Sequence, residues 1–244
     1  MADAPVVPHL YLLGGIELQG IGQPSADRLL AQSKLAALCA LLALAPEGRL
    51  QRRDRLVGML WPELDQSHAR AALRKALHAL RGALGEEALR TRGDDEVAFE
   101  PGAIWCDAVE LATAIDKGHL AHAVKLYRGE LMPGFHLPDC AEFDHWLEEE
   151  RTEARERAAS AAWALAKRME SDEKLTDAGS WARKAARFAL DDERVLRRTI
   201  SLLARIGDHA GALKLYDEFA ARMKADLDAS PSPETIALVD GLRK

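Results

Sequence analysis

The sequence contains few cysteines and no secretion signal. Its three cysteines, Cys39, Cys106 and Cys140, are odd in number and widely spaced, which excludes a disulfide framework as the basis of the fold. No basic segment followed by an apolar stretch, of the kind that directs secretion, is found. We therefore expect a reduced protein located in the cytoplasm.

Long apolar runs and β-branched residues are also scarce. The Ala- and Leu-rich run from Leu35 to Ala45 is far shorter than the roughly 20 residues needed to span a bilayer. It predicts a buried core helix, and we expect no membrane partner. Because Ala and Leu dominate an apolar fraction of 48%, the composition favours a mainly α-helical protein.

Signatures of catalysis are missing. The sequence has no Walker-type phosphate loop and no GxSxG elbow, and its N-terminal glycine pairs lack the strand-to-helix context of a dinucleotide site. We therefore expect no enzymatic activity, no catalytic residues and no cofactor. The aromatic residues of the later helices are interpreted as core residues.

One turn-rich stretch could suggest a metal site. Its single cysteine has no thiolate partner, and no HExxH arrangement is present, so we expect no metal and interpret the stretch as turn and helix-start residues, with Asp139 or Glu142 opening a long helix. The residues weighed as ligands are His119, His122, His136, Asp139, Cys140, Asp144 and His145.

The net charge of −6 disfavours nucleic acid as a partner, because DNA-binding domains offer cations to phosphates. This average conceals an asymmetry. Between Arg28 and Arg81 there are ten Lys and Arg residues against four Asp and Glu residues, a local excess of 6 positive charges. The N-terminal part is therefore a candidate for DNA binding.

The length of 244 residues favours two domains, which we place at 1–104 and 105–244. In the first, residues 9–22 predict a small hairpin. Three helices follow, over residues 33–45, 53–61 and 67–84, with Gly85 ending the third. Residues 88–102 then predict a second strand pair that turns at 93–95. This order is typical of a winged helix-turn-helix domain.

The third helix separates an apolar stripe from a basic face. Leu73, Leu77, Leu80 and Leu84 recur at helical spacing, and cations occupy the other side. A helix fits the major groove, where basic side chains reach bases, while cations elsewhere contact phosphates or the minor groove. The residues predicted to read bases are Arg74, Lys75, His78 and Arg81, and those predicted to hold phosphates or to lie on the wing are Lys34, Arg52, Arg53, Arg55, Arg70, Arg90 and Arg92. A solvated basic face is the competing interpretation.

The second domain contains no convincing strand after Asp107. A long helix is expected from about Phe143 to Met169, followed by helices over 175–190, 193–206 and 209–224. The segment TDAGSWARKA is loosely echoed by DHAGALKLYD about one tetratricopeptide period later. A last helix should begin at Pro233 with Ser232 as its N-cap. The domain is therefore expected to be all-α, with tetratricopeptide-like repeats.

Several segments resemble bacterial transcriptional activators of the antibiotic regulatory protein type. They are RRDRLVGMLWPELDQSHARAALRKALHALRGALG, CDAVELATAI, LYRGELMPGF, AEFDHWLEEER, GDHAGALKLYDEF and SPSPETIALV. The resemblance implies a winged domain that binds direct repeats at promoters, often as side-by-side subunits such as a homodimer on DNA, and that contacts RNA polymerase. It also implies a tetratricopeptide-like bacterial transcriptional activator domain as a regulatory module.

The resemblance also bears on individual residues. Arg74, Lys75, His78 and Arg81 match the groove-facing part of the recognition helix, whereas Ala79 and Gly82 stand where relatives often have arginine. Many relatives continue into further domains, so a short regulator and a fragment of a longer one both remain open. Two other functions remain open as well: a protein-interaction adaptor with a degenerate winged domain, and a ligand sensor with a pocket among the repeat helices.

Overall fold

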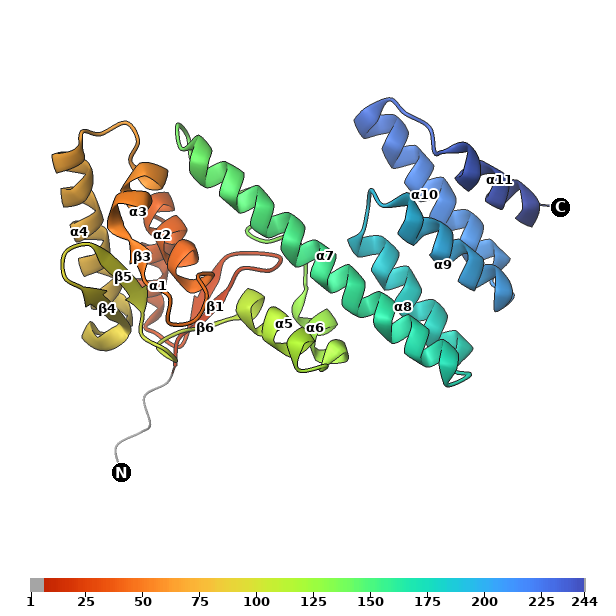
Figure 1. The fold of residues 1–244 in the computed structure, drawn as a ribbon, viewed down its shortest axis with the longest axis horizontal. Coiled ribbons are helices and arrows are strands. Elements are labelled where there is room, and N and C mark those ends of the chain that lie inside the picture. Colours follow the sequence, from red (N-terminus) through yellow and green to blue (C-terminus); the bar gives the residue numbers. More distant parts are fainter. Residues whose placement is uncertain (1–6, 244) are drawn as a thin grey trace. The chain divides into compact units, whose positions relative to one another are not determined.

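The computed structural model describes residues 7–243, apart from the side chain of Leu227. The chain forms two compact units, and each is described by itself. The first unit comprises residues 7–113 and 126–154, and the second comprises residues 114–125 and 155–243. Figure 1 shows the first unit as strands and helices and the second as helices alone. The predicted fold class, a small α/β winged domain followed by an all-α part, is confirmed.

A three-stranded sheet opens the first unit. Strands β1 (His9–Tyr11) and β2 (Glu17–Gln19) are antiparallel, with Leu10 opposite Leu18, and β6 (Trp105–Cys106) lies parallel to β1. Leu10 and Leu18 are buried, whereas Glu17 and Gln19 are exposed, as the two-residue repeat of a half-buried strand requires. The predicted hairpin is confirmed, but β6 escaped prediction because two residues carry no periodicity.

Four helices follow: α1 (Gln23–Leu30), α2 (Ser33–Ala43), α3 (Arg53–Leu60) and α4 (Gln66–Leu84). Helix α2 is buried over Leu35–Leu42, as expected for its apolar run. Helix α1 was not predicted from the sequence. It begins at a Gln-Pro pair that suggests a turn, although proline is favoured in a first helical turn, and it buries only Ala26 and Leu29. Short, mostly polar helices of this kind give a weak pattern.

The predicted wing is present as a hairpin after α4 (Figure 1). A 3₁₀ turn (Glu86–Ala88) leads into β4 (Leu89–Arg92), which pairs with β5 (Glu96–Phe99). Gly93 adopts a φ of 56° in the connecting turn, a conformation that glycine accepts without strain. A two-residue strand, β3 (Gln51–Arg52), adds to the other edge of β5. The wing strand β5 is therefore paired along both edges, with β4 on one side and β3 on the other.

Asp107 anchors the start of α5 (Asp107–Asp116) within the first unit. Its carboxylate is 1% exposed and accepts hydrogen bonds from the backbone N–H groups of Leu12, at 2.8 Å, and Leu13, at 3.1 Å. Arg128 lies 3.4 Å from the same carboxylate. Burial raises the pKa of Asp107, whereas these three donors act in the opposite direction. The side chain thus satisfies two backbone donors inside the core.

A later part of the chain completes the first unit. Arg151, in the first half of α7 (Ala141–Ser171), donates to the carbonyl oxygens of Leu131, Met132 and Phe135 at 2.7 to 3.0 Å. Leu131 in turn forms an isolated bridge with Leu13. The contacts of the first unit therefore include residues beyond the expected domain boundary at 104/105, which stays a prediction.

The three cysteines are buried and free. Burial raises the pKa of the Cys39 and Cys106 thiols to about 12 in each case. The thiol of Cys140 faces the carbonyl oxygen of Leu60 at 3.6 Å. At neutral pH these thiols are protonated and act as small apolar side chains.

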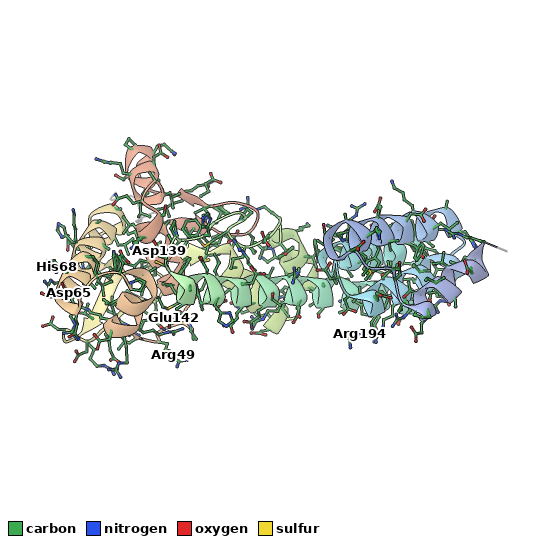
Figure 2. The ribbon with its side chains drawn as sticks, turned by 90° about the horizontal axis from the view of Figure 1, so that it is seen from above. Arg49, Asp65, His68, Asp139, Glu142 and Arg194 are labelled. Atoms are coloured by element: carbon green, nitrogen blue, oxygen red, sulfur yellow. The ribbon has the colours of Figure 1, made fainter. Side chains whose placement is uncertain are left out.

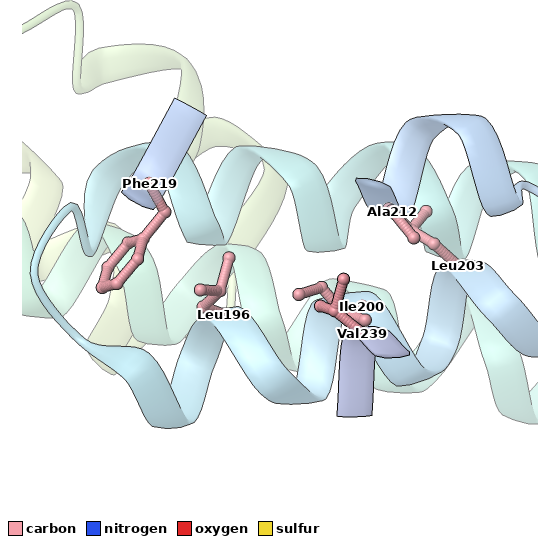
Figure 3. Packing of buried hydrophobic residues seen from close by; sticks show 6 residues of the cluster. All are labelled: Leu196, Ile200, Leu203, Ala212, Phe219 and Val239. Carbon is pink, nitrogen blue, oxygen red and sulfur yellow. The ribbon is translucent and has the colours of Figure 1, made fainter. Parts of the chain in front are cut away.

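The second unit contains the end of α5, most of α6 (Leu120–Leu126) and the second half of α7. It continues with helices α8 (Leu175–Phe188), α9 (Glu193–Arg205), α10 (His209–Leu227) and α11 (Pro233–Leu242). Each helix from α8 onward packs on the next one along the chain. Figure 3 shows a core between α9, α10 and α11 formed by Leu196, Ile200, Leu203, Ala212, Phe219 and Val239. The predicted helices and the start at Pro233 are confirmed.

Glu193 joins the beginnings of α9 and α11. Its carboxylate accepts hydrogen bonds from the backbone N–H and hydroxyl of Ser232 and from the hydroxyl of Thr235, and Arg197 lies 3.4 Å away. Burial alone would raise the pKa of Glu193, but the Ser232 and Thr235 donors and Arg197 outweigh it, so the pKa is lowered. The ionised carboxylate therefore stabilises this junction.

Glu193→Gln is expected to lower the melting temperature at neutral pH. Since the folded pKa is lowered, the carboxylate contributes stability above the ordinary value of 4.5 and loses it as pH falls through the folded pKa. The difference in melting temperature between wild type and variant should therefore shrink on acidification, as followed by circular dichroism. Glu234→Gln, at an exposed position in the first turn of α11, is the control. A difference independent of pH would contradict this role.

Candidate nucleic-acid interface

Helix α4 is capped by Asp65 at its start and by Gly85 at its end. The Asp65 carboxylate accepts hydrogen bonds from the backbone N–H groups of Ser67, at 3.0 Å, and His68, at 3.1 Å. The N–H and ring of His68 lower the pKa of Asp65, and both side chains lie at the start of the helix (Figure 2). Gly85 ends the helix with a φ of 109°. The predicted bounds of the helix are confirmed.

The two faces of α4 are as predicted. Leu73, Leu77 and Leu80 are at most 2% exposed and pack into the first unit. Arg74, Lys75 and His78 are exposed on the other side, and Arg81 is half-buried. Arg74, His78 and Arg81 are spaced by four and three residues, so they share one helix face. These four side chains form no ion pair or side-chain hydrogen bond with any described residue.

Arg70 and Lys34 differ from this group because each is paired. Arg70 donates to Asp54 at 2.8 Å, and Lys34 donates to Glu63 at 2.6 Å. The ammonium of Lys34 also lies 5.9 Å from the ring centroid of Trp61. Solvent screens such exposed ion pairs, so they stabilise the fold little and a phosphate can replace the carboxylate at small cost. Their predicted role at phosphates stays a prediction.

The predicted wing cations are mostly engaged within the protein. Arg92 pairs with Glu96 at 3.1 Å, and Arg90 donates to the carbonyl oxygen of Gly48. Arg53 is 15% exposed at its side chain and lies 3.9 Å from Asp94 in the wing turn. The Nε atoms of Arg53 and Arg90 are buried and have no hydrogen-bond partner among the described residues. These arginines support the base of the wing, and Arg92 is the exposed one of the three.

Two predicted phosphate contacts lie near the start of α3. Arg52 is exposed at the N-cap position of α3, where no described side chain caps the helix. The N–H of Arg53 donates to the carbonyl oxygen of Asp95 at 2.8 Å, which leaves the next N–H groups of the first turn free. Arg55 is exposed and lies 3.4 Å from the side-chain oxygen of Gln51. The free N–H groups and Arg52 together form an electropositive end.

Arg49 was counted in the sequence-based charge excess but not among the predicted contacts. It is exposed in the connection between α2 and β3, and it lies on the first unit in Figure 2. Its position in a turn gave no helical pattern, so only its charge could have indicated it. With Arg52 it extends the positive surface of this unit.

The structure offers no support for a metal site or a membrane helix within its described part. The His, Cys, Asp and Glu side chains of residues 7–243 form no cluster of three or more that could hold a metal ion. Among the same residues, no helix combines the length and the hydropathy that crossing a bilayer requires.

Comparison with known proteins identifies the second part of the chain. Residues 107–243 match the family described as bacterial transcriptional activator domain. The chain belongs to this family. The bacterial transcriptional activator domain covers more than half of the sequence, so the resemblance to transcriptional activators of the antibiotic regulatory protein type is confirmed at this level.

One solved structure extends the likeness to the winged part. The structure of Mycobacterium tuberculosis EmbR, determined in complex with a low-affinity phosphopeptide, aligns with 98% of this chain at a TM-score of 0.57 and 17% identity. This similarity shows a shared fold. The chain spans 65% of the length of the EmbR chain. No curated protein is significantly similar in sequence.

Proposed function

We propose that this regulator binds double-stranded DNA in a sequence-specific manner, with α4 as the recognition helix. The observation that carries the proposal is the exposed basic face of α4. Arg74, Lys75 and His78 are accessible and have no protein partner among the described residues, while the leucines of the opposite face hold the helix in the core. Arginine and lysine can donate to the guanine edge in the major groove.

The surrounding cations contribute to DNA binding in different ways. Arg52 and the free N–H groups at the start of α3 suit phosphates. Arg55, three residues after Arg52, and Arg92, at the end of β4, are also exposed. Arg70 and Lys34 join them by exchanging Asp54 and Glu63 for phosphates. Arg53 and Arg90 act mainly by holding the wing. Arg81, half-buried, contacts the edge of the groove.

The regulator acts as an activator in the cytoplasm, without catalysis or a cofactor. Membership of the bacterial transcriptional activator domain family supports this role. The winged domain, residues 1–104, binds direct repeats at promoters as a homodimer and contacts RNA polymerase, and residues 105–244 form the regulatory module. These parts of the proposal rest on the resemblance of the sequence to activators of the antibiotic regulatory protein type.

Selection of bound sequences from a random pool of double-stranded DNA tests the proposal. We expect one enriched motif, present as two copies in the same orientation at fixed spacing. Affinity for the selected site should fall steeply with salt, because phosphate contacts release counterions. Failure to enrich any motif, with weak binding that is equal for all sequences, would favour the adaptor function over a DNA-reading one.

A further inference from the structure

A pocket of about 290 Å³ opens on the first unit, between the end of α2, the end of β5 and the start of α5. Its volume lies at the lower edge of the range of about 300 to 1,000 Å³ that is typical of small-molecule sites, so it suits one large side chain of a partner. Most of its lining is apolar and includes Leu42, Pro46, Phe99, Ile104, Trp105 and Val109.

The apolar lining reaches the surface at several adjacent residues. Val109 is 37% exposed, and Ile104 and Trp105 are half-buried. Because these side chains line one pocket, they form a continuous apolar surface and not a single exposed residue. An aliphatic or aromatic side chain that enters such a pocket is the usual anchor of a protein interface.

The walls of the pocket are fixed by the fold. Gly48 and Gly102, in the turns that border it, have φ values of 71° and 78°, which residues with a side chain rarely adopt. The ring of Trp105 lies 4.8 Å from the ring of His9, measured between centroids, and is held by this contact. A partner therefore meets a preorganised surface, which lowers the entropy lost on binding.

Carboxylates predominate among the charged groups of the lining. Glu47, Glu100 and Glu110 face one guanidinium, that of Arg49, so the lining carries two more negative than positive charges. Glu47 and Glu100 are exposed and form no ion pair or side-chain hydrogen bond with any described residue, whereas Glu110 interacts within the protein. Arg90 reaches the turn beside Glu47, but its guanidinium donates to a backbone carbonyl oxygen there.

The acidic character continues beside the pocket. The backbone N–H of Glu100 donates to the carbonyl oxygen of Ala88 at 2.9 Å, and Ala88 directly follows the exposed Glu86 and Glu87. Neither of these glutamates pairs with a described cation. Such a surface repels phosphates, so the pocket does not suit nucleic acid although α4 of the same unit does. It is complementary to lysine and arginine.

We propose that this pocket binds a basic segment of a partner protein, with one large apolar side chain in the pocket and lysine or arginine side chains on Glu47 and Glu100. The carboxylates select a cationic segment, and the small volume selects a single side chain as its anchor. The site shares no residue with α4, so its occupancy can be measured without DNA.

Selection from a random library of dodecapeptides displayed on phage, with the full chain as bait, tests the proposal. We expect the enriched peptides to combine a large apolar residue with neighbouring lysines or arginines. Fluorescence anisotropy of the best peptide, labelled with fluorescein, should show saturable binding. Replacing its cations by glutamine, or its apolar residue by alanine, should weaken binding by about tenfold or more in each case. No enrichment, or enrichment of acidic peptides, would overturn the proposal.

Variants of the protein locate the bound peptide. Glu47→Gln/Glu100→Gln and Val109→Ser should each lower affinity for it by about tenfold. The matched control is Glu156→Gln/Glu234→Gln, which removes the same charge at exposed positions of the second unit that do not line the pocket.

The control should bind the peptide as wild type does, and all variants should keep the wild-type circular dichroism spectrum. An equal loss in the control, or wild-type affinity in both pocket variants, would contradict the assignment. Dimerisation of the chain that Val109→Ser abolishes, followed by light scattering, would contradict it as well, because a second copy would then be the occupant.

Discussion

Arg74→Ala/Lys75→Ala should lower affinity for the selected DNA site by about a hundredfold while leaving the helical content unchanged. Each side chain is exposed and forms no ion pair or hydrogen bond with any described residue, so its loss should be felt mainly in the complex. A base contact is worth about 1 to 3 kcal/mol, and each lost phosphate contact also reduces the salt dependence of binding. Titration in a gel-shift assay at two salt concentrations measures both effects.

The matched control is Lys167→Ala/Arg168→Ala. These residues are also an adjacent lysine and arginine, exposed on a helix, but they lie in the second unit. The control removes the same charge and should bind DNA as wild type does. Equal losses in the two double variants would mean that net charge, and not α4, governs affinity. An unchanged affinity in Arg74→Ala/Lys75→Ala would reject α4 as the recognition helix.

Asp107→Ala is expected to lower the free energy of unfolding of the first unit by about 3 kcal/mol or more. The substitution leaves the buried N–H groups of Leu12 and Leu13 without an acceptor, and each unsatisfied buried donor costs about 1 to 3 kcal/mol. It also removes the partner of Arg128. Urea unfolding followed by circular dichroism measures the change.

Asp116→Ala serves as the control for this prediction. Asp116 ends the same helix, but it is exposed and accepts no side-chain hydrogen bond from the described residues. Its replacement should change the urea midpoint little. A small effect of Asp107→Ala, comparable to that of the control, would show that water or a shifted backbone satisfies Leu12 and Leu13.

Helices with a clear apolar period could be predicted closely from the sequence. The leucine stripe and Gly85 predicted the position of α4, and the N-cap residue Ser232 followed by Pro233 predicted the start of α11. Helix α1 and strands β3 and β6 were missed, because their existence depends on packing and pairing with distant residues such as Leu10 and Val97. Local sequence carries little of that information.

The sequence predicted which residues of the candidate interface are basic and which helix face they share. It did not predict which of them already have partners within the protein. Sequence alone treats Arg53, Arg70, Arg90 and Arg92 as available to DNA, as it does Arg74. In the fold each of the first four has a partner within the protein. These partners are Asp94, Asp54, Gly48 and Glu96, in the same order.

The hydrogen bonds of Arg151 bear on how such regulators exchange DNA specificity. This arginine holds the backbone of Leu131, Met132 and Phe135, and the bridge between Leu13 and Leu131 joins that segment to the winged part. Between the two parts, the chain passes through the second unit. A gene segment encoding residues 1–104 therefore carries the recognition helix without part of the core that supports it. Recombination between regulators of this architecture must transfer two separate segments, or select a recipient whose later segment already fits.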